Sequence, residues 1–220
     1  MPTASPCASR LDRVRSCRWH DEAVRTHFDP QTIDPGDYYK LLTTSVVPRP
    51  IAWVSTVSAD GVPNLAPYSF YSVSSSAPPV VQFTSVGRKD SLRNIEETGE
   101  FVINLATEPL FDQINQTSAN YDSSVSEYTA VDLESEPSET VRPLRVVASP
   151  LSIEATLHRV VEVGNSFVVM GAVTLITVRT EYLADDGLPD FGALAPLSRL
   201  GRDEWGLPPA VRRIQRPDRP

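Results

Sequence analysis

The chain has 220 residues, of which 40% are hydrophobic and 22% are charged. A chain of this size and composition buries a core without help from disulfides or metal ions. Its formal net charge of -8 argues against nucleic acid or an anionic membrane surface as a general partner. The two cysteines, Cys7 and Cys17, have neither disulfide-framework nor metal-ligand spacing, so we expect a cytoplasmic protein with no metal. No apolar run approaches the roughly 20 residues of a membrane-spanning helix.

The composition divides the chain into three parts. Residues 1–26 carry five arginines but no apolar run of signal-peptide length, so we expect a disordered leader or a start codon assigned too far upstream. Residues 27–206 are expected to form one domain. Residues 207–220 form a basic, proline-rich tail.

Helices and strands are expected from residue 35 onward. Asp34 followed by Pro35 is typical of a helix start, which predicts a short helix over 35–42. The apolar run 51–58 predicts a strand, and Asp60-Gly61 predicts a hairpin turn into a second strand at 63–66. A third strand is expected at 80–86, after two prolines.

The middle of the chain alternates between short helices and a strand. Asp90 is a candidate N-cap for a helix that ends at Gly99. A strand follows at 101–105, and a helix is expected over 108–117, with Leu110 and Ile114 on its buried side.

The last third of the chain is expected to supply the longest strands. Residues 118–143 are polar and contain prolines, which predicts a long functional or dimer-wrapping loop, and the acidic run 132–139 is typical of a solvated segment. Residues 151–163 and 166–178 predict a long antiparallel hairpin around Gly164-Asn165. The sum is a mainly β domain, a barrel or a sandwich with a few helices.

The segment 87–91 has the residue types of a phosphate site. Gly87, Arg88 and Lys89 precede Asp90 and Ser91 at an expected helix start, so cations, a hydroxyl and free backbone amides come together. A solvated turn before a capped helix explains the same pattern equally well. Because no Walker or dinucleotide glycine motif is present, a monophosphate is favoured over a pyrophosphate.

The segment 64–76 is rich in side chains that donate and accept hydrogen bonds. Hydroxyls and an amide at alternating strand positions suit ring carbonyls, ribityl oxygens or a phosphate, and Phe70 could stack on an aromatic ring. A polar edge strand with a serine loop is the alternative. The polar members are Asn64, Tyr68, Ser69, Tyr71, Ser72, Ser74, Ser75 and Ser76.

Little in the sequence points to a catalytic side chain. His20 and His27 lie at or beside the leader, and His158 lies in an expected strand, where a structural histidine is common. No nucleophile elbow or zinc-protease motif occurs. If the protein is an enzyme, a cofactor supplies the reactivity. Trp53 is expected in the core or at an interface, while Trp205 fits a ligand site, a dimer seam or a tail anchor.

Six segments of the chain together form a recognisable pattern. They are HFDP at 27–30, YKLL at 39–42, VPRPIAWVSTVSADGVPNLAPYSF at 47–70, APPVVQF at 77–83, GRKDSLRNIEETGEFVINL at 87–105 and NQTSANY at 115–121. In this order they resemble the flavin reductase-like family, whose fold is the FMN-binding split barrel. The resemblance covers about residues 27–206.

The resemblance implies a homodimer that binds FMN, or alternatively FAD, in a groove at or near the subunit interface. It implies an isoalloxazine contact for Arg49, Pro50, Ser55 and Thr56, and ring and ribityl contacts for Asn64, Leu65, Ala66, Pro67, Tyr68, Ser69, Phe70 and Ser72. It places the phosphate at Ser85, Gly87, Arg88, Lys89 and Ser91, with weaker correspondences at Asn115, Ser118 and Arg199. In reductase members, NAD(P)H reduces the flavin, which then serves a separate monooxygenase.

One departure from the family bears on function. Many reductase members have a Gly-Asp-His turn where this chain has Gly164-Asn165-Ser166, so a histidine associated with nicotinamide binding is missing. The leading hypothesis is an NAD(P)H:flavin reductase for a two-component monooxygenase. The alternatives are an FMN enzyme with its own organic substrate, and a non-catalytic flavin-binding electron carrier.

Overall fold

The computed structural model describes residues 25–217, so the predicted leader lies almost entirely outside the described residues. Contacts divide the chain into two units, Met1–Tyr38 and Tyr39–Pro220. Near the end of the first unit, the Asp34 carboxylate accepts a hydrogen bond from the Gly36 amide (2.8 Å). This bond confirms a capped start for helix α1 (Pro35–Ser45). Among the described helices, none is long and apolar enough to cross a membrane.

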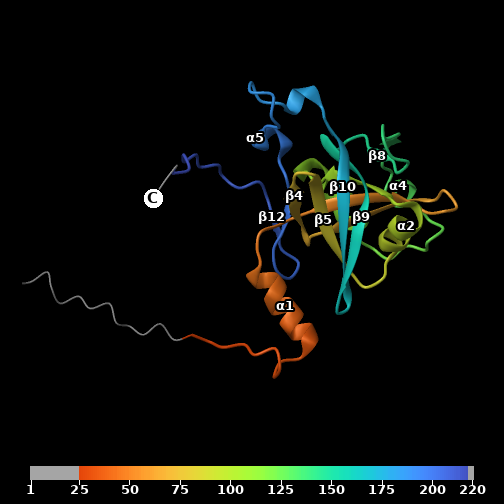
Figure 1. The fold of residues 1–220 in the computed structure, drawn as a ribbon. Helices are drawn as coiled ribbons and strands as arrows, with labels where there is room; N and C mark the ends of the chain where they lie inside the picture. Colours follow the sequence, from red (N-terminus) through yellow and green to blue (C-terminus); the bar gives the residue numbers. More distant parts are fainter. Residues whose placement is uncertain (1–24, 218–220) are drawn as a thin grey trace, which may run out of the picture. The chain divides into compact units, whose positions relative to one another are not determined.

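A seven-stranded antiparallel sheet dominates the second unit (Figure 1). Its long central hairpin is formed by β9 (Leu151–Val163) and β10 (Ser166–Val178), as the sequence predicts. The strand order is β3-β2-β6-β9-β10-β5-β4. The other members are β2 (Ala52–Val57), β3 (Pro63–Tyr68), β4 (Tyr71–Ser76), β5 (Pro79–Val86) and β6 (Glu100–Leu105).

The two edge strands of this sheet are joined by only two residues. β3 ends at Tyr68 and β4 begins at Tyr71, so the first and last strands must come together. The Thr84 amide on β5 donates to the Phe70 carbonyl (2.8 Å), and the rings of Tyr68 and Phe83 lie 4.7 Å apart. The sheet therefore curls into a barrel with an opening between β3 and β4.

Apolar side chains fill the barrel and a second, smaller cluster outside it. The interior cluster includes Phe83, Phe101 and Val169, each with no exposed surface. Trp53 belongs to the second cluster and is also fully buried. It is therefore part of the core of this chain. Because neighbouring residues of a strand point to opposite faces, Trp53 and Val54 on β2 serve different clusters.

Gly171 on β10 is needed because Phe101 lies against it. A Cβ added at Gly171 would lie 2.6 Å from Phe101 Cε1 and 3.0 Å from Ala155 Cβ. Since Phe101 is fully buried, it cannot swing away. We expect Gly171→Ala to lower the free energy of unfolding by about 1–3 kcal/mol in urea titrations. Adding Phe101→Leu should recover part of that loss, and a purely additive double mutant would contradict the clash.

The helices cover the sheet near the sites that the sequence singles out. Helix α2 (Asp90–Thr98) packs against β2 and β3 and ends at Gly99 in the left-handed conformation, as expected. The prediction that Asp90 caps this helix is wrong. Asp90 is its first helical residue, the N-cap is Lys89, and the Asp90 carboxylate instead pairs with Arg93 (2.8 Å).

The segment expected to be one helix over 108–117 is two shorter pieces. A 3-10 turn (Glu108–Leu110) precedes α3 (Phe111–Gln116), and Leu110 and Ile114 are buried as predicted. Pro109 lies in the first turn of the 3-10 piece, where a backbone amide has no partner within the helix, so its missing amide hydrogen is tolerated.

Residues 118–143 are more ordered than a free loop. They contain α4 (Glu127–Ala130) and β7 (Ser135–Glu136), which pairs with β8 (Arg145–Val146). The buried Glu154 carboxylate accepts from the Glu139 amide (3.0 Å) and the Thr140 amide (2.6 Å). The loop is therefore tied to the sheet. Shorter elements complete the unit: β1 (Arg49–Pro50), β11 (Ser198–Arg199), β12 (Trp205–Gly206), α5 (Phe191–Leu194) and a 3-10 turn (Thr180–Tyr182).

Candidate functional site

Three adjoining cavities meet at Pro67 on β3, and we call them together the Pro67 groove. The largest, of about 300 Å³, lies between the end of β3, the start of α2 and the loop after α3. Two smaller cavities of about 140 Å³ each extend it, one toward Trp205 and one toward Tyr39. Predicted site residues that line the groove are Asn64, Ala66, Pro67, Tyr68, Ser69, Phe70, Arg88, Lys89, Ser91, Asn115, Ser118 and Arg199.

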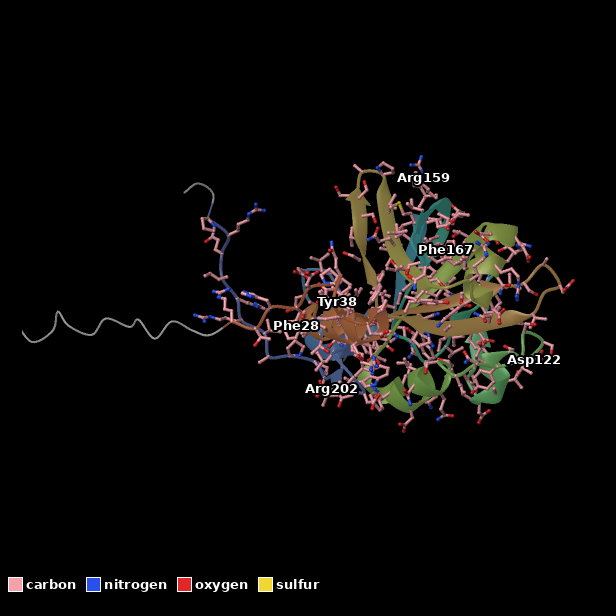
Figure 2. All side chains as sticks on the ribbon, turned by 90° about the horizontal axis from the view of Figure 1, so that it is seen from below. Phe28, Tyr38, Asp122, Arg159, Phe167 and Arg202 are labelled. Atoms are coloured by element: carbon pink, nitrogen blue, oxygen red, sulfur yellow. The ribbon has the colours of Figure 1, made fainter. Side chains whose placement is uncertain are left out.

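The cationic end of the groove is the start of α2. No side chain caps this helix, so its first backbone amides are available to an anion. Lys89 is exposed and forms no ion pair with any described residue. Arg88 is already engaged. It pairs with Glu96, and its guanidinium lies 5.0 Å from the centre of the ring of Phe167, which is labelled in Figure 2.

A short chain of hydroxyl and amide groups forms the inner wall of the largest cavity. Asn64 Nδ2 donates to Ser91 Oγ (2.9 Å), which links β3 to α2. Burial raises the pKa of the Tyr68 hydroxyl, so it stays protonated and can donate. The hydroxyls of Ser91 and Ser85 oppose that rise in pKa, although neither reaches full hydrogen-bond geometry with the Tyr68 hydroxyl.

Buried hydrogen bonds hold the walls of the groove in place. Trp53 Nε1 donates to Thr117 Oγ1 (2.9 Å), and Thr117 lines the largest cavity. The Tyr128 hydroxyl lies 3.1 Å from the Leu144 carbonyl and 3.0 Å from Ser55 Oγ. Because a carbonyl only accepts, Tyr128 donates to Leu144 and accepts from Ser55.

Some predicted site residues do not line the groove. Arg49 is buried, and its guanidinium donates to the carbonyls of Thr43, Val46 and Leu200, so it ties the end of α1 to the C-terminal segment. Pro50 lines a separate apolar hollow. The remaining predicted residues outside the groove are Ser55, Thr56, Leu65, Ser72, Ser85 and Gly87.

These outlying residues have other contacts. Thr56 Oγ1 accepts from Asn94 Nδ2 (3.1 Å), and Ser85 Oγ donates to the Gly87 carbonyl (2.8 Å). Gly87 has a φ of +78°, a conformation that favours glycine and lets the loop turn into α2. Ser72 is exposed on β4.

The sequence reasoning missed several residues that line the groove. Tyr39 was not expected at the site, whereas a ligand site was one of three alternatives for Trp205, which does line the groove. Trp205 packs against Phe111 (4.9 Å between ring centres) and Arg199 (4.8 Å from guanidinium to ring centre). Asn120 and Tyr121 follow α3 in the loop that also holds Asp122 (Figure 2), and Glu127 begins α4. The family motif at 115–121 includes Asn120 and Tyr121, so the sequence contained a signal for these two residues.

A sequence model of the flavin reductase-like domain matches residues 44–192, well over half of the chain. The chain belongs to the flavin reductase-like family. A relative in Bacillus subtilis, the uncharacterized protein YwrF, is 36% identical over 189 residues, which are 81% of this chain and 92% of the relative.

Two solved structures in this fold resemble the chain closely. Component B of nitrilotriacetate monooxygenase from Bacillus cereus is 29% identical, with a TM-score of 0.82 over 87% of this chain and 99% of the other. The 2-nitrobenzoate 2-nitroreductase NbaA from Pseudomonas fluorescens is 27% identical, with a TM-score of 0.81 over 88% and 97%. A flavin reductase with a split barrel domain from Shewanella frigidimarina NCIMB 400 is 21% identical, with a TM-score of 0.79 over 88% of this chain and 100% of the other. The barrel of this flavin reductase-like protein is therefore a split barrel, as the sequence resemblance implies.

The groove of this flavin reductase-like protein has a donor set that fits a flavin mononucleotide. A phosphate needs cations and free amides, which Lys89, Arg88 and the start of α2 provide. A ribityl chain needs hydroxyl and amide partners, which Asn64 and Ser91 provide. In the cavity toward Trp205, the indole of Trp205 is the aromatic side chain available to a flavin ring among the described lining residues.

Proposed function

We propose that the chain binds FMN in the Pro67 groove and acts as an FMN-dependent oxidoreductase. The observation that supports this most is the uncapped start of α2, where Lys89 and Ser91 line the same cavity. A monophosphate suits this place because one helix start and one short cationic segment match a single phosphate group. FAD is the alternative flavin, since the groove is open to solvent.

The chain's own residues would bind and orient the flavin. Lys89, Arg88 and the first amides of α2 would hold the phosphate, while Asn64 and Ser91 would position the ribityl chain. Pro67, Ser69 and Trp205 would border the ring. A bound flavin supplies hydride transfer, so no nucleophilic side chain is needed.

We propose, as the most specific role, an NAD(P)H:flavin reductase that supplies a two-component monooxygenase. Support comes from the 29% identity to component B of a monooxygenase from Bacillus cereus. The second candidate is an FMN enzyme that reduces its own organic substrate, and the 27% identity to a nitroreductase favours it. A non-catalytic electron carrier is a third reading.

The tip of the β9–β10 hairpin bears on this choice. The Gly87 amide donates to the Asn165 carbonyl (2.9 Å), so the turn without the expected histidine lies beside the loop that leads into α2. Ser166 Oγ donates to Asn165 Oδ1 (3.0 Å). A substrate that approaches from this side would meet an amide and a hydroxyl in place of an imidazole.

We also propose a homodimer. Leu207, Val47 and Phe191 are exposed around an apolar hollow of about 440 Å³. Exposed apolar surface of this kind is typical of subunit interfaces.

The proposed function predicts a nicotinamide-dependent spectral change. Under anaerobic conditions, the protein with FMN should lose its visible flavin absorbance after NADH or NADPH is added, much faster than free FMN does. A bound flavin that stays oxidised with both nicotinamides would contradict the reductase role. In that case the bound flavin is reduced chemically instead. If nitrobenzoate or another organic acceptor then reoxidises it, the second candidate, an FMN enzyme that reduces its own organic substrate, is favoured.

A further inference from the structure

An acidic side chain lies in the cavity that we assign to the phosphate. Glu127, the first residue of α4, lines this cavity together with Lys89 and Ser91, and only 6% of its surface is exposed. A buried carboxylate is an unexpected neighbour for an anion, because like charges repel each other. Its presence therefore needs a reason.

One oxygen of Glu127 has a structural role. Glu127 Oε2 accepts a hydrogen bond from the Leu65 amide (2.9 Å), on the outer edge of β3. Backbone groups along a strand alternate in direction, so residues 63 and 67 face the same way as Leu65. Both are prolines without an amide hydrogen, which leaves Leu65 as the outward donor of this edge. A neutral glutamine would accept this bond equally well, so the bond alone does not explain the charge.

The surroundings of Glu127 make its charge responsive to a ligand. Burial raises the pKa of the Glu127 carboxyl, and Asp90 at the start of α2 adds to the rise, while the Leu65 amide opposes it. Arg88 and Lys89 face the cavity from the loop before α2, and Tyr68 and Tyr121 border it from β3 and from the loop after α3. A sphere of about 300 Å³ is about 8 Å across, no more than the Debye length at physiological ionic strength, so salt screens a charge pair within it only partly.

We propose that Glu127 sets how tightly the Pro67 groove holds a phosphomonoester. Its ionised carboxylate repels the ligand's phosphate, and this repulsion is lost when the carboxylate takes up a proton. This inference rests on the proposed flavin phosphate site. Binding of the phosphate then draws a proton to Glu127. By the same coupling, ionisation of Glu127 weakens the phosphate's contribution to affinity.

The test compares FMN with riboflavin, which lacks only the phosphate. Dissociation constants for both are measured by flavin fluorescence from about pH 5 to about pH 8.5, in wild type, Glu127→Gln and the exposed control Glu108→Gln. At the alkaline end, the preference for FMN over riboflavin should be about tenfold greater in Glu127→Gln than in wild type. The two proteins should converge toward the acidic end, because protonation of Glu127 removes the charge that the glutamine lacks, and the control should follow wild type throughout.

The outcomes separate this inference from the proposed function. A protein that prefers FMN, but whose Glu127→Gln variant matches wild type at every pH, overturns the role of Glu127 alone. No preference for FMN in any variant overturns the phosphate site itself. Equal changes in FMN and riboflavin affinity mean that Glu127 contacts the ribityl chain or the ring, which also overturns the inference.

A measurement on wild type covers the case in which Glu127→Gln does not fold. Infrared difference spectra are recorded on adding FMN or riboflavin at about pH 6, where the second ionisation of a phosphate monoester is half complete. FMN should increase the protonated-carboxyl signal, and riboflavin should not. Identical carboxyl signals for the two ligands would contradict proton uptake at Glu127.

Discussion

Replacing Lys89 and Arg88 together with alanine is expected to weaken FMN binding by about 10- to 100-fold and to leave riboflavin binding nearly unchanged. A charge-assisted hydrogen bond contributes about 1.5–3 kcal/mol, and only FMN has the phosphate that receives it. Lys89 should account for more of the loss than Arg88, because Arg88 already pairs with Glu96 and lies over Phe167. Fluorescence titration of both flavins measures the effect.

The control for this pair is Arg142→Ala. Arg142 and Arg88 both have 60% of their side chains exposed, and Arg142 also pairs with a glutamate, Glu100, away from the groove. It should change neither dissociation constant. Equal losses of FMN and riboflavin affinity in the double variant would refute a phosphate contact, since both ligands share every other group.

Trp53→Ala should produce the largest loss of stability, a decrease of about 3–5 kcal/mol in the free energy of unfolding. The ring has no exposed surface, and a close-packed interior relaxes only partly into the space that it leaves. The substitution also removes one of two hydrogen bonds of Thr117, a groove residue whose hydroxyl accepts from the indole (2.9 Å) and donates to the Ile114 carbonyl (3.0 Å). Urea unfolding followed by circular dichroism measures the stability, and flavin titration below the transition measures the binding.

Two variants separate volume from hydrogen bonding at Trp53. Trp53→Phe keeps much of the volume and loses the indole donor, so it should be milder than Trp53→Ala. Trp205→Ala removes a half-buried indole beside the groove and should affect binding more than stability. A Trp53→Ala protein as stable as wild type would contradict the assignment of this residue to the core.

Sequence pattern predicted the larger elements because local rules govern them. The hairpin of β9 and β10 follows from two apolar runs around Gly164, and the start of α1 follows from Asp34 and Pro35. The start of α2 was misassigned by one residue because an aspartate that begins a helix and one that caps it occur in the same sequence context. Helix α4 was missed because four residues show no periodicity.

Short stretches of sequence predict one part of the candidate site, and contacts between distant residues determine the rest. The sequence by itself determined the family, the split barrel and the two segments, 64–70 and 87–91, that supply just under half of the residues lining the groove, because their chemistry lies within short stretches. Only the tertiary structure decided that Glu127 and Trp205 also line it and that Arg49 ties α1 to residue 200 instead. These contacts join residues far apart in the chain, and the curvature of the sheet determines which of them meet.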